Sequence, residues 1–370
     1  MNRNTVVALP PVDYADWEDY HLTKDCGMVP YLLHKRYGMD VSMVGTVEDL
    51  DEYPSKEMVP GLKLVPMPHV NVVEKTEYLI ENGAEIDVLV LYGMYVPNMA
   101  MAITYKAVNP DGFVYVALDA NSRWIPLINT EDELFRNFIS CVDLMATSCR
   151  SLAMYLTVKW GRKIECITNG YYNWLGDAYP KCVFEDKENT ILTVSRLGTE
   201  QKATDVLLEA FAGVARDIPG WSLKLIGHME EDFQAYLRNY FSEHPDLKER
   251  VIFTGVIKDK KHLAEEYEKA KIFALPSRWE GGNPNVISEA LTAGCVTAVT
   301  KFDAWADCIA DGKCGAAVEV DDAVGFGACL KSLCLGERLW EMSETAREHA
   351  DDFYNMEKNV DFIYRKLMGQ

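Results

Sequence analysis

The chain has 370 residues, 48% of them hydrophobic and 25% charged, a composition typical of a globular protein with a substantial core. Its net charge of −20 argues against nucleic-acid binding, which favours clustered Lys and Arg, and against strong attraction to anionic lipid. The length favours two domains or one large domain. The ten cysteines form no Cys-x-x-Cys pair, so buried thiols explain them better than a disulfide framework or a zinc site.

The first residues lack the long apolar core of a signal peptide, and no stretch reaches the apolar length that spans a bilayer. We therefore expect a soluble, cytoplasmic protein in which membrane contact, if it occurs, is peripheral.

Short apolar runs alternate with amphipathic stretches along the chain. In chain order, the runs expected to form strands are 5–9, 41–45, 62–67, 87–93, 113–119, 191–196, 222–227, 251–255, 272–277 and 296–300. The stretch 203–216 has helical periodicity, with an apolar stripe of Val206, Leu207, Ala210, Phe211 and Val214. Strands separated by helices predict parallel sheets, because parallel strands are joined by crossover connections.

The strand–helix series restarts near the middle of the chain. Residues 164–189 are rich in turn residues, and a new strand pattern begins at Ile191. We place the domain boundary here, between domains of residues 1–170 and 171–352. The last segment, 353–370, is expected to be helical, with one apolar side made of Phe353, Met356, Val360, Ile363, Tyr364 and Leu367.

The stretch "PSRWEGGNPNVISEALTAG", residues 276–294, follows a buried strand. Asn283 is a good N-cap and Pro284 suits the first helical position, while Gly294 suits the end of the helix. The loops after the strands of open α/β sheets bind ligands, and a helix start offers free N–H groups to an anion. The two adjacent glycines, Gly281 and Gly282, allow a ligand to approach the backbone closely.

Two carboxylates bracket this expected anion site. Glu289 lies about 9 Å along the helix from its cap, at ~1.5 Å per residue, and a carboxylate can accept both hydrogen bonds of a ribose diol. Glu280, at the end of the strand, can accept from the hydroxyls of a second sugar or face a developing positive charge. A phosphate between two sugar-binding acids describes a nucleotide sugar, although a plain strand–loop–helix with two unrelated glutamates explains the stretch equally well.

Arg196 directly follows a strand, and Lys202 stands at the start of the next helix. Both are expected at the carboxyl edge of the sheet, where they could hold a departing diphosphate as its charge develops. Taken alone, this pair is better explained as two exposed loop cations.

Taken together, these segments fall in the order and spacing of the family 4 glycosyltransferases of the GT-B fold, which the chain resembles closely over residues 191–320. The segments "ITNGYY" and "TKDCGMVPYLL", similar to a domain-closing element and a first glycine loop, extend a weaker resemblance to the N-terminal half. The resemblance implies an α/β fold of two Rossmann-like domains that face a deep cleft. The first domain would bind the acceptor and be completed by a crossover helix at 353–370, and the second would bind the nucleotide-sugar donor.

The resemblance also implies a role for individual residues. Arg196 and Lys202 would bind the donor diphosphate in place of a metal, and Glu280 would contact the donor sugar near its anomeric side. The remaining implied contacts are Gly27 beside the diphosphate, Gly227 in the donor cleft, the backbone near Ile257 at the base, Gly282, Asn283, Asn285 and Val286 at phosphate and sugar hydroxyls, and Glu289 at the ribose.

The sequence departs from the family pattern twice. Eight residues separate Glu280 from Glu289 where the family usually has seven, and a bulge at the two glycines is expected to absorb the extra residue. Asp119 stands where a first-domain strand of the family often ends in a His that faces the donor sugar. Asp119 can hydrogen-bond a sugar hydroxyl or simply cap the next segment, and the sequence leaves both roles open.

We therefore expect a retaining hexosyltransferase that uses a nucleotide sugar, a UDP-sugar by preference, and needs neither metal nor cofactor. The acceptor would be a glycan, a lipid-linked molecule or a protein. A catalytically inactive sugar-nucleotide-binding subunit is the alternative of another class. A GT-B sugar-nucleotide epimerase is a further alternative, but it needs acid/base carboxylates and histidines around one sugar, which this sequence does not display.

Overall fold

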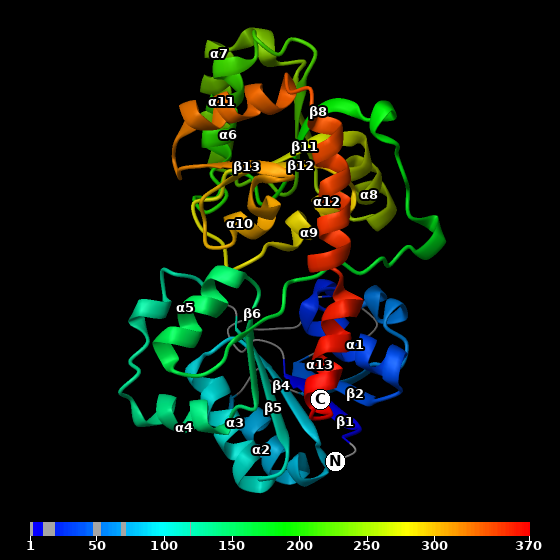
Figure 1. The fold of residues 1–370 in the computed structure, drawn as a ribbon, viewed down its shortest axis with the longest axis vertical. Helices are drawn as coiled ribbons and strands as arrows, with labels where there is room; N and C mark the ends of the chain where they lie inside the picture. The colour runs from blue at the N-terminus through cyan, green and yellow to red at the C-terminus, as the bar shows by residue number, and fades with distance from the viewer. Residues whose placement is uncertain (1–2, 10–18, 47–52, 68–71, 119) are drawn as a thin grey trace. The chain divides into compact units, whose positions relative to one another are not determined.

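The computed structural model describes residues 3–9, 19–46, 53–67, 72–118 and 120–370, and the chain folds as two compact units (Figure 1). The first unit comprises Met1–Tyr172 and Asn355–Gln370, and the second comprises Asn173–Tyr354. Each unit is built around one parallel sheet.

The sheet of the first unit has the order β3-β2-β1-β4-β5-β6-β7. Its strands are β1 (Thr5–Leu9), β2 (Asp40–Thr46), β3 (Lys63–Met67), β4 (Val88–Tyr92), β5 (Phe113–Leu118), β6 (Leu144–Thr147) and β7 (Glu165–Cys166). The helices are α1 (Asp25–Tyr37), α2 (Val72–Asn82), α3 (Val96–Val108), α4 (Glu133–Cys141), α5 (Arg150–Trp160) and α13 (Met356–Leu367). Short 3-10 helices are η1 (Asp19–Thr23), η3 (Pro54–Met58), η4 (Gly83–Glu85) and η5 (Ile125–Leu127).

The sheet of the second unit has the order β10-β9-β8-β11-β12-β13. Its strands are β8 (Glu188–Val194), β9 (Ser222–Ile226), β10 (Val251–Gly255), β11 (Ala270–Leu275), β12 (Val296–Thr300) and β13 (Gly315–Val318). The helices are α6 (Thr204–Val214), α7 (Phe233–Glu243), α8 (Lys260–Lys269), α9 (Asn285–Thr292), α10 (Trp305–Cys308), α11 (Ala323–Cys334) and α12 (Leu339–Phe353). Short 3-10 helices are η6 (Gly176–Ala178), η7 (Phe184–Asp186), η8 (Pro245–Leu247) and η9 (Ala310–Gly312).

The ten expected strands are confirmed as β1 to β5 and β8 to β12. The pattern missed β6, β7 and β13, which are short. The segment "LMAT" of β6 follows a charged Asp143, and "GAAV" of β13 contains one β-branched residue, so neither carries the dense β-branched signal of the others. All strand pairings among the described residues are parallel, as the alternation of strands and helices predicted.

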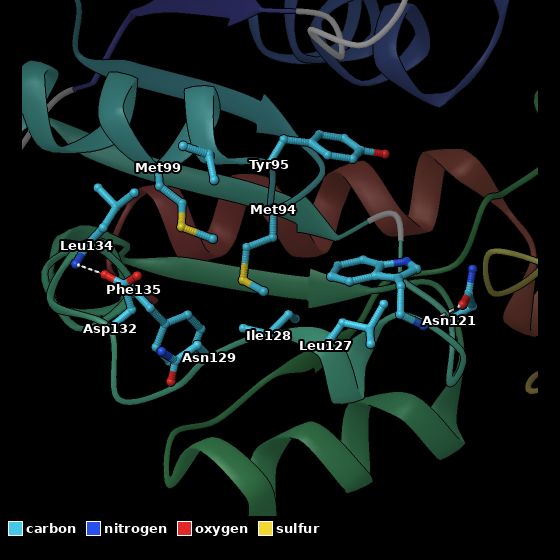
Figure 2. Close-up of a pocket in the computed structure, with 12 residues that line it drawn as sticks. Met94, Tyr95, Met99, Asn121, Leu127, Ile128, Asn129, Asp132, Leu134 and Phe135 are labelled. Carbon is cyan, nitrogen blue, oxygen red and sulfur yellow. Dashed lines mark hydrogen bonds between the residues drawn. The ribbon is translucent and has the colours of Figure 1, made fainter.

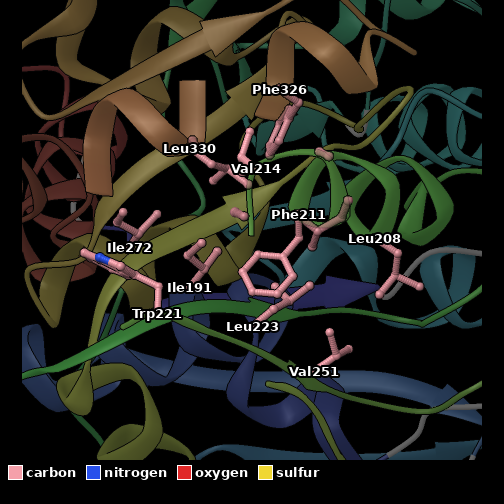
Figure 3. Packing of buried hydrophobic residues seen from close by; sticks show 14 of the residues in the cluster. Ile191, Leu208, Phe211, Val214, Trp221, Leu223, Val251, Ile272, Phe326 and Leu330 are labelled. Atoms are coloured by element: carbon pink, nitrogen blue, oxygen red, sulfur yellow. The ribbon is translucent and has the colours of Figure 1, made fainter. Parts of the chain in front are cut away.

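The apolar stripe of α6 forms part of the core of the second unit (Figure 3). Leu207 and Phe211 are fully buried, and they share one cluster with Ile191 of β8, Leu223 of β9 and Phe326 of α11. Helices α6 and α11 cover one face of this sheet, and α8, α9 and α12 cover the other (Figure 1). The sheet is therefore buried on both faces, as parallel sheets normally are.

The C-terminal segment differs from the single helix expected at 353–370. Helix α12 ends at Phe353 and α13 begins at Met356, because the side chain of Asn355 accepts hydrogen bonds from the N–H groups of Glu357 and Lys358 and so caps a new helix. Helix α13 then packs on α1 of the first unit, where Arg36 pairs with Asp361 at 2.8 Å.

The strand order of the second sheet reverses direction between β8 and β11. The chain leaves β8 toward β9 on one side and leaves β11 toward β12 on the other, so the two following loops diverge above the carboxyl ends of adjacent strands. Open α/β sheets bind ligands at such a switch point. The loops concerned are residues 195–203 and 276–284.

Within the described part of the chain, no helix has the combination of length and apolar character that crosses a membrane. All ten cysteines are free thiols, and Cys26, Cys149, Cys295, Cys308 and Cys314 are buried. Burial raises the pKa of the Cys295 thiol to about 11, which keeps this thiol protonated and unreactive at neutral pH.

Candidate active site at the β8–β11 switch point

Arg278 holds the two switch-point loops together. Its backbone N–H donates to the carbonyl of Gln201 at 2.8 Å, and its guanidinium donates to the carbonyl of Glu200 at 2.8 Å. The same guanidinium pairs with Asp205 at 3.0 Å and with Asp321 at 2.5 Å. The loop after β8 is therefore fixed against the loop after β11 by both backbone and side-chain contacts.

Lys202 and Glu280 form an ion pair between these loops. The Lys202 Nζ lies 2.5 Å from Oε1 of Glu280, and the side chains are only 13% and 6% exposed. The hydroxyl of Ser277 donates to the same carboxylate oxygen at 2.5 Å. Two residues 78 positions apart, both selected from the sequence, thus lie in direct contact.

Gln201 connects Arg196 to this pair. The Arg196 guanidinium donates to the side-chain oxygen of Gln201 at 2.8 Å. The Gln201 amide nitrogen in turn donates to the carbonyl of Trp279 at 3.1 Å and, more distantly, to Oε2 of Glu280 at 3.4 Å. One hydrogen-bonded network therefore joins Arg196, Lys202 and Glu280, and the exposed Arg196 is its solvent-facing end.

The sequence analysis did not select Gln201, Ser277 or Arg278. Gln201 directly precedes Lys202, and Ser277 stands three residues before Glu280. Closeness in sequence to these two selected residues is the signal that could have identified Gln201 and Ser277. Nothing local marks Arg278 as the residue that joins the loops, since its partners Glu200 and Asp205 lie more than 70 residues away in the sequence.

The backbone beside Lys202 is strained. Ala203 has φ 47° and ψ 47°, the left-handed region, and is fully buried at the start of α6. This conformation costs a non-glycine residue roughly 1–2 kcal/mol. Such outliers concentrate at functional sites, where the surrounding structure holds them in place.

Gly227 directly follows β9 and lies beside the loop that carries Arg196. It has φ 141°, and a Cβ atom built on it would lie 1.8 Å from the carbonyl oxygen of Ser195. No side chain fits there without displacing the backbone of that loop. Gly227 thus allows the backbone of Ser195, the residue before Arg196, to pass close to the end of β9. Its contact with a ligand is a proposal.

The start of α9 differs from the expectation. Asn283 is not the N-cap: Pro284 holds that position in extended conformation and the helix begins at Asn285, without a side-chain cap. The Asn283 side chain is buried and accepts a hydrogen bond from the hydroxyl of Tyr354 at 2.8 Å, so it is not available to cap the helix. Gly294, with φ 74°, follows the helix as predicted.

The N-terminus of α9 is nevertheless suited to a polar ligand. Gly282 has φ 96° and is buried, while Val286 lies in the first turn of the helix. The side-chain oxygen of Asn285 is buried and has no hydrogen-bond partner among the described residues. A buried acceptor without a partner is costly, and a donor group of a ligand would satisfy it.

Glu289 is held by a tyrosine that the sequence analysis did not select. Oε2 of Glu289 accepts a hydrogen bond from the hydroxyl of Tyr267 on α8 at 2.8 Å. Burial, and then the charge of Glu289, raise the pKa of Tyr267 well above its ordinary value. Tyr267 therefore stays protonated at neutral pH and orients the carboxylate.

Three other predicted residues lie apart from this network or outside the description. Gly27 is inside helix α1 and not in a loop as expected: a Cβ atom there would lie 2.3 Å from the carbonyl oxygen of Leu22, so the residue allows η1 to pack on the helix. Ile257 is half-buried in the connection between β10 and α8. Asp119 lies outside the described residues.

Comparison with known proteins shows similarity to glycosyltransferases over part of the chain. Residues 188–335 match the family model of glycosyl transferases group 1. A phosphatidyl-myo-inositol mannosyltransferase of Mycolicibacterium smegmatis is 26% identical over 196 residues, which cover 52% of this chain and 48% of that protein. An uncharacterized glycosyltransferase of Haemophilus influenzae is 34% identical over 116 residues, or 31% of each chain. The matches thus span about half or less of these curated relatives.

Similarity of fold extends further. The structure of Anabaena HepE in complex with UDP has a TM-score of 0.75 to this chain and covers 99% of it, with 100% of HepE covered, at 12% sequence identity. HepE has also been solved in complex with UDP-glucose. Identity this low shows the fold alone. The α/β GT-B fold expected from the sequence is confirmed, and residues 188–335 are similar to the group 1 glycosyltransferases.

Proposed function

We propose that the chain is a family 4 glycosyltransferase that moves a hexose from a nucleotide sugar, preferably a UDP-sugar, to an acceptor hydroxyl with retention of configuration and without a metal. The observation that carries this proposal is the Lys202–Glu280 pair, joined to Arg196 and located at the switch point of the unit that matches the family. The complexes of HepE with UDP and UDP-glucose support the choice of donor.

Arg196 and Lys202 would bind the donor diphosphate. Arg196 is exposed and can turn its fork to the phosphate oxygens, while Lys202 is a point charge close to the strand ends. Lys202 is already shared with Glu280, so diphosphate binding adds a second anion to one cation and does not require the pair to break. The network keeps both cations beside the switch point before the donor arrives, which favours electrostatic stabilisation.

Glu280 and Glu289 would bind the two sugars of the donor. Among the described residues, Oε2 of Glu280 has one hydrogen bond, a 3.4 Å contact with Gln201, and retains capacity to accept from a sugar hydroxyl. Glu289 would accept from the ribose diol while Tyr267 orients it. Gly282, Asn283, Asn285 and Val286 would serve phosphate and sugar oxygens at the start of α9, with Asn283 acting through its backbone.

The proposed chemistry needs no nucleophile on the protein. The bond between the anomeric carbon and the leaving phosphate oxygen breaks, and the acceptor oxygen bonds to the same face of that carbon. The acceptor proton passes to the departing phosphate oxygen, so the products are a glycoside and a nucleoside diphosphate. Arg196 and Lys202 hold the developing negative charge, and catalysis rests on positioning and electrostatics.

The roles of Gly27, Asp119, Gly227 and Ile257 in donor binding, the cytoplasmic location and the acceptor type are part of the same proposal. A catalytically inactive binding subunit is the second candidate, and the eight-residue spacing between Glu280 and Glu289 favours it.

A panel of nucleotide sugars, incubated with the purified chain and simple acceptors in excess EDTA, tests the proposal. NMR of the product should show the anomeric configuration of the donor retained. Turnover that is lost in EDTA and restored by Mn²⁺ or Mg²⁺ contradicts metal independence. Tight UDP binding without turnover supports the inactive subunit, and an epimerised sugar with no transfer supports the epimerase.

A further inference from the structure

The first unit contains a cavity of about 570 Å³ between the loop after β4, η5 and the start of α4 (Figure 2). Its wall includes Met94, Met99, Ile128, Leu134 and Phe135. Met94 follows β4 closely, so the cavity begins at the carboxyl edge of the first sheet, where open α/β sheets bind ligands. Its volume falls in the range of about 300–1,000 Å³ that is usual for ligand sites.

The wall is fixed by polar groups that bond to the backbone. The buried amide of Asn98 donates to the carbonyls of Tyr92 at 2.6 Å and Gly93 at 3.0 Å, which holds the loop after β4. The oxygen of Asn121 accepts from the N–H of Trp124 at 3.2 Å and so orders the approach to η5. The cavity wall is therefore ordered both at the loop after β4 and at the approach to η5.

The cavity carries little charge. None of its lining residues is Lys, Arg or His, and Asp132 is its single acid. That carboxylate accepts from the N–H of Leu134 at 2.8 Å and caps α4. Without a cation in the wall, an anionic group such as a phosphate would lose its hydration there with no opposite charge to compensate. The wall thus suits an uncharged, apolar occupant.

The edge of the cavity is also apolar. Val96 and Leu127 line it, yet their side chains are 64% and 82% exposed. Large apolar residues exposed beside an apolar cavity indicate that the occupant covers them as it binds. The two methionines, Met94 and Met99, have flexible thioether side chains that adapt to an extended chain.

We propose that this cavity binds the uncharged alkyl tail of an amphiphilic acceptor and leaves the hydroxyl-bearing end of that acceptor outside it. The assignment of the occupant as an acceptor rests on the proposed function. The binding of an alkyl tail rests only on the cavity itself.

Binding of n-octyl β-D-glucoside, kept below its micelle concentration, to the full chain without donor tests this directly by calorimetry. Octyl glucoside should bind and methyl β-D-glucoside should not. Leu127→Asp should weaken octyl glucoside binding about tenfold or more, because a carboxylate would then meet the tail. Val158→Asp is the matched control: Val158 is 81% exposed on α5 of the same unit and does not line the cavity.

Equal binding of octyl and methyl glucosides, or equal loss in the Leu127 and Val158 variants, overturns the proposal. Met99→Trp provides a second variant, which should exclude the tail by filling the cavity while the apolar wall is preserved. UDP binding to the Leu127 variant separates this inference from the proposed function. If the wild-type chain binds octyl glucoside but not UDP, the alkyl-tail site is supported and the proposed transferase is contradicted. If it binds UDP but not octyl glucoside, the alkyl-tail site is contradicted and the proposed transferase is supported.

Discussion

Replacement of Lys202 by methionine is expected to have two separable effects, a loss of stability in the second unit and a loss of turnover. The Lys202 Nζ lies 2.5 Å from Glu280 Oε1, and both side chains are nearly buried. At an effective dielectric constant of about 20, two unit charges at this separation attract by roughly 7 kcal/mol. Desolvation offsets most of that attraction, and removal of one partner of a buried pair costs about 3–5 kcal/mol.

The lower end of that range applies here, because Ser277 continues to donate to the orphaned carboxylate at 2.5 Å. A loss of about 3 kcal/mol corresponds to a fall in Tm of roughly 6–12 °C for a unit of this size. Loss of the cation at the diphosphate should in addition lower kcat by on the order of a hundredfold or more. Thermal unfolding by circular dichroism and steady-state kinetics measure the two effects separately.

The double variant Lys202→Met/Glu280→Gln separates structure from chemistry. Without a buried unpaired charge, most of the lost Tm should return, yet kcat should stay low because no cation replaces Lys202 and the donor sugar has lost the Glu280 carboxylate. Lys224→Met is the matched control: Lys224 pairs with Glu266 at 2.6 Å in the same unit, and their side chains are 15% and 17% exposed. It should lower Tm and leave kcat intact. Recovery of kcat together with Tm in the double variant would refute a direct role of Lys202.

Three further predictions follow from single contacts. Gly227→Ala should raise the KM for the donor and lower Tm, because its Cβ would meet the Ser195 carbonyl at 1.8 Å; unchanged donor kinetics contradict this. Tyr267→Phe should weaken UDP binding about fivefold to tenfold, because Glu289 loses one hydrogen bond. Tyr240→Phe, which loses a hydrogen bond to a backbone carbonyl, is the control and should leave UDP binding unchanged in calorimetry. Burial raises the pKa of Tyr267 above that of an unfolded tyrosine, near 10, so the contribution of Tyr267 to the free energy of unfolding should be constant below about pH 10 and fall above it. In urea titrations, an equal alkaline loss of stability in Tyr267→Phe argues against this contribution.

The parts of the fold with strong local signals were predictable from the sequence. Dense β-branched runs such as "TVVAL" and "VTAVT" marked their strands, and the helical stripe of 203–216 marked α6 within two residues of its ends. The positions of Arg196 and Lys202 after β8, and of Glu280 after β11, followed from the rule that places ligands at the carboxyl edge of a parallel sheet. Their direct contact needed the structure.

Errors arose where a distant residue decides a local outcome. Asn283 has a strong preference for helix caps, but its side chain is taken by Tyr354, 71 residues away. Gly27 resembled a loop glycine, yet it lies in α1 because η1 packs against it. Tyr267 and Glu289 are 22 residues apart on different helices, so no spacing pattern connects them. Tertiary contacts of this kind override local propensity.

The central claim is that Arg196 and Lys202 recognise a diphosphate at the switch point of the second unit. Calorimetric titration of the wild-type chain and of Arg196→Ala with UDP and with uridine tests it most directly, because only UDP carries the diphosphate. The exposed Arg196 can be removed with little effect on stability. We predict that the wild-type chain binds UDP at least about tenfold more tightly than uridine, and that the variant loses most of this preference by loss of a charged hydrogen bond. Equal affinity for UDP and uridine in the wild-type chain, or an undiminished preference for UDP in the variant, would contradict the account.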